Sequence, residues 1–236
     1  MPSFLLLDMH LFVQCILYLT LFVLGFVVSI PLGVTTSDFD GHCILYGDIS
    51  WKNETFFTYK MSSNINCSLG IYFAVFACIF YGLAMAIYYG YAITRKDPNI
   101  GFQMWVMPFI LVTALAAIVS FIASCIISVG FKQFCDSLVD RPKVPLSSCR
   151  DGSKINWNIL GNTSINPSHY FAYLTVTQLA SWITFLVWSA QLILLILRFV
   201  RNRRLRSKGQ LQDTQASPAS SGPDDLQKIA SVQPTA

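Results

Sequence analysis

Four long apolar runs are the feature that most constrains this chain of 236 residues. They cover about residues 11–32, 69–93, 102–129 and 170–197, and none of them contains Asp, Glu, Lys, Arg or His. Each reaches the length of roughly 20 residues that crosses a bilayer as a helix. Because lipid offers no hydrogen-bond partner, a spanning segment must satisfy its own backbone, as a helix does. We therefore predict an all-α membrane protein with an antiparallel four-helix transmembrane bundle.

The amino-acid composition supports this fold class and limits the classes of partner that we expect. Only 12% of the residues are charged and 54% are hydrophobic, whereas soluble domains carry about 25% charged residues. The net charge of +4 is too small to indicate a nucleic-acid partner, so we expect membrane lipids and no nucleic acid. The start, "MPSFLLLDMH", lacks the basic residues of a signal peptide, which favours retention of the first run as a helix.

A basic cluster after the fourth run sets the expected orientation. It consists of Arg198, Arg201, Arg203, Arg204, Arg206 and Lys208. Basic residues flanking a span favour the cytoplasmic side, so four crossings put both termini in the cytoplasm. The loops at about 33–68 and 130–169 are then lumenal or extracellular. Residues 1–200 form the predicted four-pass domain, and the Ser-, Gln- and Pro-rich segment 201–236 is a predicted disordered cytoplasmic tail.

Three glycosylation sequons agree with that orientation, although the second loop also carries several basic residues. They begin at Asn53, Asn66 and Asn162, and all three lie in the two long loops. We rank their expected use as Asn53, then Asn162, then Asn66. Asn66 ranks last because it lies close to the second helix and beside a cysteine.

The chain has seven cysteines, some in the apolar runs and the others in the two long loops. Cys15, Cys78 and Cys125 lie in the apolar runs, where cysteine acts as a small apolar residue. The first loop holds Cys43 and Cys67, and the second holds Cys135 and Cys149. An even number in each loop of an oxidising compartment predicts disulfides. Four cysteines allow three connectivities, of which the local pairing within each loop is favoured over one that cross-links the loops.

The stretch "DFDGHCILYG", residues 38–47, gathers side chains that bind metals. A zinc site needs about four ligands, whereas His42 here stands beside a cysteine expected in a disulfide. Asp38, Asp40 and Gly41 are typical of a turn, which is the favoured interpretation. Histidines are scattered elsewhere and no HExxH, GxSxG or phosphate-binding motif occurs. We expect no enzyme, cofactor or metal site.

Small and polar residues mark the faces on which the helices are expected to pack. The second run carries the stripe Ala74, Cys78, Gly82, Ala86 and Gly90, and the third carries Ala116, Ser120, Ser124 and Ser128. Such stripes allow close helix packing, while a dimer face or a lipid groove is the alternative. Gln14, Gln178 and Gln191 are the costly polar groups, and Gln178 is the expected source of a hydrogen bond across the bundle.

Three segments resemble the transmembrane protein 179 family: "DFDGHCILYG", "ASCIISVGFKQFCDS" and "TQLASWITFLVW". The resemblance covers about residues 14–197. It implies a four-pass membrane protein with two extracellular loops and no established catalytic activity. Other four-pass families fit less well, because the second loop lacks the "CCG" of tetraspanins and the first lacks the tryptophan-leucine-tryptophan-cysteine pattern of claudins.

These features favour a non-enzymatic interaction or membrane-organising component with a structural ectodomain. It would act at the plasma membrane or in secretory or vesicle membranes, with membrane or lumenal proteins, or a second copy of the chain, as partners. Two alternatives remain open. One is a small transporter or channel auxiliary subunit, favoured by the polar stripes, and the other is a lipid-binding membrane protein.

Overall fold

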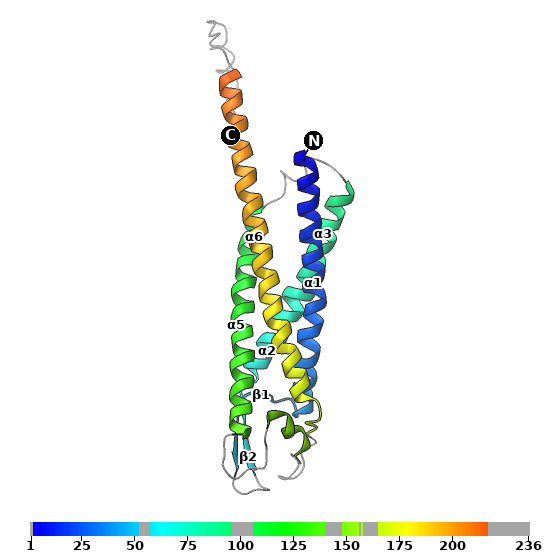
Figure 1. Cartoon of the computed structure of the whole chain (residues 1–236), viewed down its shortest axis with the longest axis vertical. Helices are drawn as coiled ribbons and strands as arrows, with labels where there is room; N and C mark the ends of the chain where they lie inside the picture. Colours follow the sequence, from blue (N-terminus) through cyan, green and yellow to red (C-terminus); the bar gives the residue numbers. More distant parts are fainter. Residues whose placement is uncertain are drawn as a thin grey trace, which may run out of the picture. The chain divides into compact units, whose positions relative to one another are not determined.

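The computed structural model describes residues 2–51, 57–95, 106–139, 148–155, 157 and 165–216 (Figure 1). Its helices are α1 (Pro2–Asp38), α2 (Ile65–Phe73), α3 (Gly82–Arg95), α5 (Val106–Val139) and α6 (Tyr170–Ala216). The π-helical segment η1 (Ala74–Tyr81) joins α2 to α3 without a break. Strands β1 (Cys43–Trp51) and β2 (Phe57–Ser62) follow α1, and the short 3-10 helix η2 (Cys149–Lys154) precedes α6.

The four predicted membrane helices are confirmed. Segments long and apolar enough to cross a bilayer run over Met9–Asp38, Ile65–Thr94, Met107–Val139 and Tyr170–Arg201. Each holds at least 30 residues, which exceeds the length that a bilayer requires. The surplus turns are accommodated by tilt of the helix or by its extension beyond the hydrocarbon layer.

Three helix ends next to the two long loops differ from the sequence-based boundaries. Helix α1 continues to Asp38 instead of ending near residue 32, and α2 begins at Ile65 instead of near residue 69. Helix α5 continues to Val139, about ten residues past the predicted end. Hydropathy detects only the part of a helix that meets lipid. The added turns carry polar residues such as Lys132 and Asp136, which is why they were assigned to loops.

The predicted disordered tail is partly wrong. The chain divides into two units, residues 1–195 and 196–236, and the second begins within α6. Helix α6 continues to Ala216, so residues 201–216 are helical instead of disordered. This segment is rich in Arg, Leu, Lys and Gln, which favour helices, and its first proline is Pro218. The remaining tail, 217–236, lies outside the described residues.

The predicted stripe on the second membrane helix packs mainly against α1. A Cβ atom at Gly25 of α1 would lie 3.0 Å from the carbonyl oxygen of Ala74 and 2.6 Å from Cγ1 of Ile79. One at Gly82 would lie 3.4 Å from the carbonyl oxygen of Tyr18. The two backbones therefore approach closely at both glycines. This supports the helix-packing interpretation and identifies α1 as the partner helix.

Gly25 should therefore be intolerant of a larger residue. We expect Gly25→Val to lower the thermal unfolding midpoint in mild detergent clearly, because overpacking of a tight contact costs about 1–3 kcal/mol. Gly33→Val is the matched control in the same helix, since a Cβ atom there meets nothing within 4 Å. Equal midpoints for the two variants would contradict the close approach of α1 and η1.

The two-stranded antiparallel sheet was not predicted. Its register pairs Asp48 with Lys60, Ile49 with Tyr59 and Ser50 with Thr58. The register shifts between Cys43 and Asp48, where Tyr46 adopts a positive φ of 63°. A bulge of this kind bends a strand. Here it lets β1 pair with β2 while its first half lies on the helices.

Candidate functional site: the disulfide-tied cap of the bundle

At one end of the bundle, β1, β2, η2 and the adjoining ends of α1, α2, α5 and α6 share one hydrophobic core, which we call the cap. Its fully buried members include Phe39, Ile44, Leu45, Phe134, Trp157, Tyr170 and Leu174. These residues come from widely separated parts of the sequence. The two long loops therefore fold together as one structure instead of forming two independent loops.

The turn that enters the cap is the one expected at residues 38–42. Gly41 has φ 76°, and its backbone N–H donates to the carbonyl of Thr36 at 2.9 Å, which closes the C-terminal end of α1. The N–H of His42 donates to the carbonyl of Phe39 at 3.1 Å. Asp40 also has a positive φ, a conformation that Asp tolerates. The turn prediction is confirmed, and His42 is exposed beside it.

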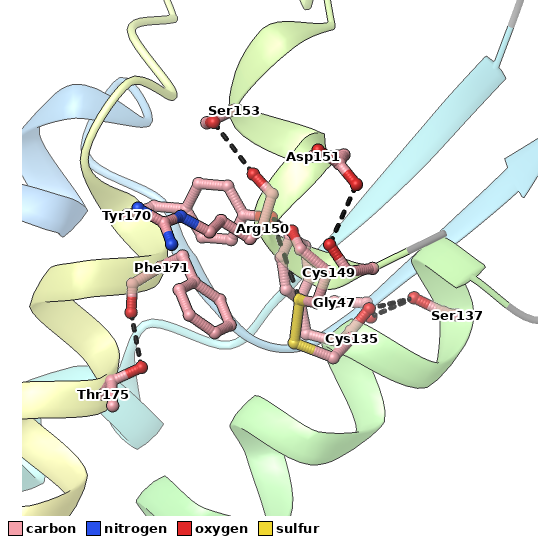
Figure 2. The surroundings of a disulfide bond; sticks show 12 residues. Gly47, Cys135, Ser137, Cys149, Arg150, Asp151, Ser153, Tyr170, Phe171 and Thr175 are labelled. Carbon is pink, nitrogen blue, oxygen red and sulfur yellow. Dashed lines mark hydrogen bonds between the residues drawn. A yellow bond between two sulfur atoms is a disulfide. The ribbon is translucent and has the colours of Figure 1, made fainter. Parts of the chain in front are cut away.

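Two disulfides fasten the cap, with the local pairing that the sequence favoured. Cys43 at the start of β1 is joined to Cys67 in α2, 24 residues later. Cys135 near the end of α5 is joined to Cys149 at the start of η2, 14 residues later. Figure 2 shows the second bond with Tyr170 and Phe171 of α6 nearby. The first bond thus ties strand β1 to a membrane helix, and the second ties η2 to another.

Aromatic rings fill the centre of the cap. Trp157 stands between Phe39 and Phe134, with ring centroids 5.5 and 6.3 Å away. Tyr170 packs edge-on against Phe134 at 5.7 Å, and Tyr59 of β2 lies 6.2 Å from Trp157. Edge-to-face and offset contacts at these distances are favourable beyond the area they bury. The rings therefore connect the turn after α1 with α5, α6 and the sheet.

The polar atoms of these buried rings have partners in η2. Nε1 of Trp157 donates to the carbonyl oxygen of Gly152 at 3.0 Å. The hydroxyl of Tyr170 donates to the backbone carbonyl oxygen of Cys149. A Cβ atom at Gly152 would lie only 2.5 Å from Tyr170 and from Leu138. Only glycine fits there, so η2 is held tightly between α5 and the start of α6.

Strand β1 is seated on the end of α5. A Cβ atom at Gly130 would lie 2.8 Å from the ring of Tyr46 and 3.0 Å from Cβ of Leu45. Two turns later the hydroxyl of Ser137 donates to the carbonyl oxygen of Gly47 at 3.4 Å. The absence of a side chain at Gly130 therefore makes room for the bulged part of the strand.

The sequons remain predictions. Asn53 and Asn162 lie outside the described residues. Asn66 lies in the first turn of α2, half-buried, and its Nδ2 donates to the hydroxyl of Ser62 at 2.9 Å. Its neighbour Cys67 is buried in a disulfide. A glycan on Asn66 would have to replace that hydrogen bond, so this site keeps its last rank.

No group of three His, Cys, Asp or Glu side chains that could hold a metal ion occurs in the part of the chain that the structure describes. Asp38 and Asp40 belong instead to the turn after α1.

Inside the bundle, large polar side chains connect the helices. Nε2 of Gln191 donates to the backbone carbonyl of Gln14 at 3.0 Å, and Nε1 of Trp182 donates to the hydroxyl of Ser128 at 2.9 Å. The side-chain amide that hydrogen-bonds across the bundle is thus that of Gln191, whereas we expected Gln178 in that role. Gln178 is half-buried near the cap end of α6. The sequence could not separate the three glutamines, because their depth alone does not fix the direction of each side chain.

A small cavity lies between the four membrane helices. Gly70, Ala74, Ser120, Ala123, Ser181 and Thr184 are among its lining residues. The volume of the cavity is about 20 Å³. The surface that lines it is almost entirely apolar, and the hydroxyls of Ser120, Ser181 and Thr184 donate their protons to carbonyls of their own helices.

Four apolar spanning helices with a disulfide-tied cap that contains a small sheet define a four-pass integral membrane protein. The family model described as "Transmembrane protein 179/179B Claudin domain" matches residues 10–220. The chain belongs to this transmembrane protein 179/179B family.

Two curated relatives agree with this assignment. Transmembrane protein 179B of Danio rerio is 22% identical over 214 residues, covering 90% of this chain and 94% of the relative. Transmembrane protein 179B of Mus musculus is 23% identical over 185 residues, covering 77% and 80%. The resemblance found in the three sequence segments is therefore confirmed. No solved structure matches the chain.

The comparison with claudins needs correction. The missing tryptophan-leucine-tryptophan-cysteine pattern in the first loop counted against a claudin relationship, yet the matching family model is described as a claudin domain. A short motif of one loop is a narrow test of a fold.

Proposed function

We propose that the protein is a non-enzymatic interaction or membrane-organising component whose cap binds other membrane or lumenal proteins. The observation that supports this most strongly is the construction of the cap. Two disulfides and one aromatic core fix its strands and η2 to the helix ends. A surface held in this way loses little conformational entropy on binding, which favours its use as a docking surface.

Partner recovery tests the proposal. Proximity labelling from an enzyme fused to the lumenal side, followed by co-purification in mild detergent, should recover a reproducible set of proteins. A Cys43→Ser/Cys67→Ser variant should lose most of that set. Cys125→Ser is the matched control, because Cys125 is a free, half-buried thiol in a membrane helix. Failure to recover any reproducible partner, or recovery unaffected by loss of the disulfide, would contradict a role for the cap.

The proposed orientation places the cap in the lumen or outside the cell and both termini in the cytoplasm. It is supported by the basic residues after the last span and by the position of the sequons. An oxidising compartment at the cap also accords with the two disulfides. Plasma-membrane or vesicle residence is part of the same proposal.

Glycosidase treatment tests this orientation. We expect the wild-type protein from mammalian cells to shift to a lower apparent mass, since sequons in the lumen are modified. Asn53→Gln combined with Asn162→Gln should remove most of the shift, while Asn66→Gln alone should change it little. A wild-type protein insensitive to the enzyme would leave the proposed orientation unsupported, and a tag accessible on the N-terminus of intact cells would contradict it.

A transporter or channel auxiliary subunit is the second candidate, and it is favoured by the polar side chains that cross the bundle near Gln14 and Gln191. Liposome flux assays on the purified chain test it. Flux that disappears in Gln191→Leu but persists in Cys125→Ser would support this candidate over the first. Absence of flux with intact, folded protein would count against it.

A further inference from the structure

The half of the bundle away from the cap contains a group of neutral polar side chains that we call the polar layer. It comprises Gln14, Tyr18, Tyr81, Thr113, Trp188 and Gln191. These residues come from α1, η1, α5 and α6, so all four membrane segments contribute. Five of the six are almost entirely inaccessible, with at most 1% of their surface exposed, and Tyr81 is half-buried.

The members of the polar layer lie in mutual contact. The ring of Tyr18 is 6.2 Å from that of Tyr81 and 6.4 Å from that of Trp188, and the last two rings stack at 6.1 Å. The Tyr18 hydroxyl faces the hydroxyls of Tyr81 and Thr113. One helical turn before Tyr18, Gln14 accepts the bond from Gln191 through its backbone carbonyl.

The side-chain atoms of the polar layer have unmet hydrogen-bonding capacity. Among the described residues, none provides a hydrogen-bond partner of normal geometry for Nε2 and Oε1 of Gln14, the hydroxyls of Tyr18, Tyr81 and Thr113, Nε1 of Trp188 or Oε1 of Gln191. Leaving one buried polar atom unsatisfied costs about 1–3 kcal/mol. The hydroxyls of Tyr18, Tyr81 and Thr113 face one another and Nε1 of Trp188 faces Cys78, so these groups meet part of that capacity among themselves. The amide atoms of Gln14 and Oε1 of Gln191 gain nothing from these contacts, so a bound group that both donates and accepts hydrogen bonds would stabilise the layer.

The chemical groups of the polar layer indicate which kind of molecule it would bind. Its side chains are neutral and offer both donors and acceptors in the same small space, so they match a molecule that also donates and accepts. Buried water does so, typically making about three hydrogen bonds per molecule. We propose that the polar layer is an internal hydration site that binds about two or three ordered waters between α1, η1, α5 and α6.

The small apolar cavity described above supplies an internal comparison. It adjoins the layer at Cys78, which packs with Tyr18 and Trp188 in one cluster and also lines the cavity. The hydroxyls around the cavity are satisfied within their own helices. Apolar cavities of this type stay dry. Water should therefore occupy the polar layer and not the adjoining cavity.

Radiolytic footprinting of the full chain in phosphatidylcholine nanodiscs tests the proposal. Hydroxyl radicals formed from bound water by a millisecond X-ray pulse oxidise side chains beside that water. We expect Tyr18 and Trp188 to be labelled several-fold faster than two comparison residues, despite their complete burial. The comparison residues are Phe73, which lines the apolar cavity, and Trp182, whose Nε1 is bonded to Ser128. Labelling of Tyr18 and Trp188 no faster than these would overturn the proposal.

A variant pair shows whether the layer itself holds the water. Gln14→Leu combined with Thr113→Val removes three of the polar atoms and should reduce the labelling of Tyr18 several-fold. Thr184→Val, at the cavity, should leave it unchanged. Intact disulfides in peptide maps establish that each variant is folded. Undiminished labelling of Tyr18 in the folded double variant would overturn the proposal, and the wild-type measurement stands even if that variant does not fold.

Discussion

Replacing Trp157 with alanine is expected to destabilise the cap by about 3–5 kcal/mol, the usual cost of removing a large buried aromatic side chain. Trp157 is only 2% exposed and touches Phe39 of the turn after α1, Phe134 of α5 and Tyr59 of β2. Its indole N–H also donates a hydrogen bond to the carbonyl oxygen of Gly152. Removing it leaves a cavity and an unsatisfied carbonyl where the two loops meet.

Thermal unfolding of the purified chain in mild detergent measures this effect. We expect the midpoint to fall by about 10 °C in Trp157→Ala. Trp157→Phe keeps most of the ring contacts and loses the indole hydrogen bond, so its midpoint should fall less. If Trp157→Ala unfolded at the wild-type temperature, Trp157 could not occupy the centre of a packed cap.

Loss of the Cys43–Cys67 disulfide is the second change with a large expected effect. Closing a loop of this length restricts the unfolded chain by about 3 kcal/mol on the chain-entropy model, and removal of native disulfides costs about 2–5 kcal/mol. The bond also positions β1 against α2 beside the hydrogen bond from the Cys43 N–H to Oδ1 of Asn64. Its loss should therefore loosen the sheet.

Cell-surface abundance and thermal unfolding both report this loss. Cys43→Ser/Cys67→Ser should show a lower unfolding midpoint and reduced export from the endoplasmic reticulum, whereas Cys125→Ser should match the wild type. Non-reducing peptide mapping of the wild type should recover Cys43 linked to Cys67. Recovery of Cys43 linked to Cys135 or Cys149 would instead establish the cross-linked connectivity.

Much of this fold could be predicted because the membrane imposes simple rules. An uncharged run of more than 20 residues has one stable conformation in lipid, so the four helices follow from hydropathy alone. The turn at Gly41 and the local pairing of Cys43 with Cys67 follow from residue type and cysteine spacing. These features depend on neighbours in the sequence or on the solvent.

The cap could not be predicted, because it depends on contacts between distant residues. Trp157 lies in a polar stretch, and nothing near it indicates that Phe39 and Phe134 will surround it. The sheet was missed because the residues between Cys43 and Tyr59 include Gly47 and several polar side chains that obscure a strand pattern. Likewise, sequence shows that Gln14 and Gln191 are costly in lipid, but not that they meet.

The central claim is that the two loops form one cooperative cap, and hydrogen–deuterium exchange tests it most directly. The measurement compares amide exchange of η2 (Cys149–Lys154) in the full wild-type chain and in Cys43→Ser/Cys67→Ser, both in nanodiscs. The variant retains the Cys135–Cys149 bond that anchors η2. We predict faster exchange in η2 as well as in β1, because both rest on the same aromatic core. Faster exchange in β1 with unchanged protection of η2 would show that the loops fold independently and would contradict this account.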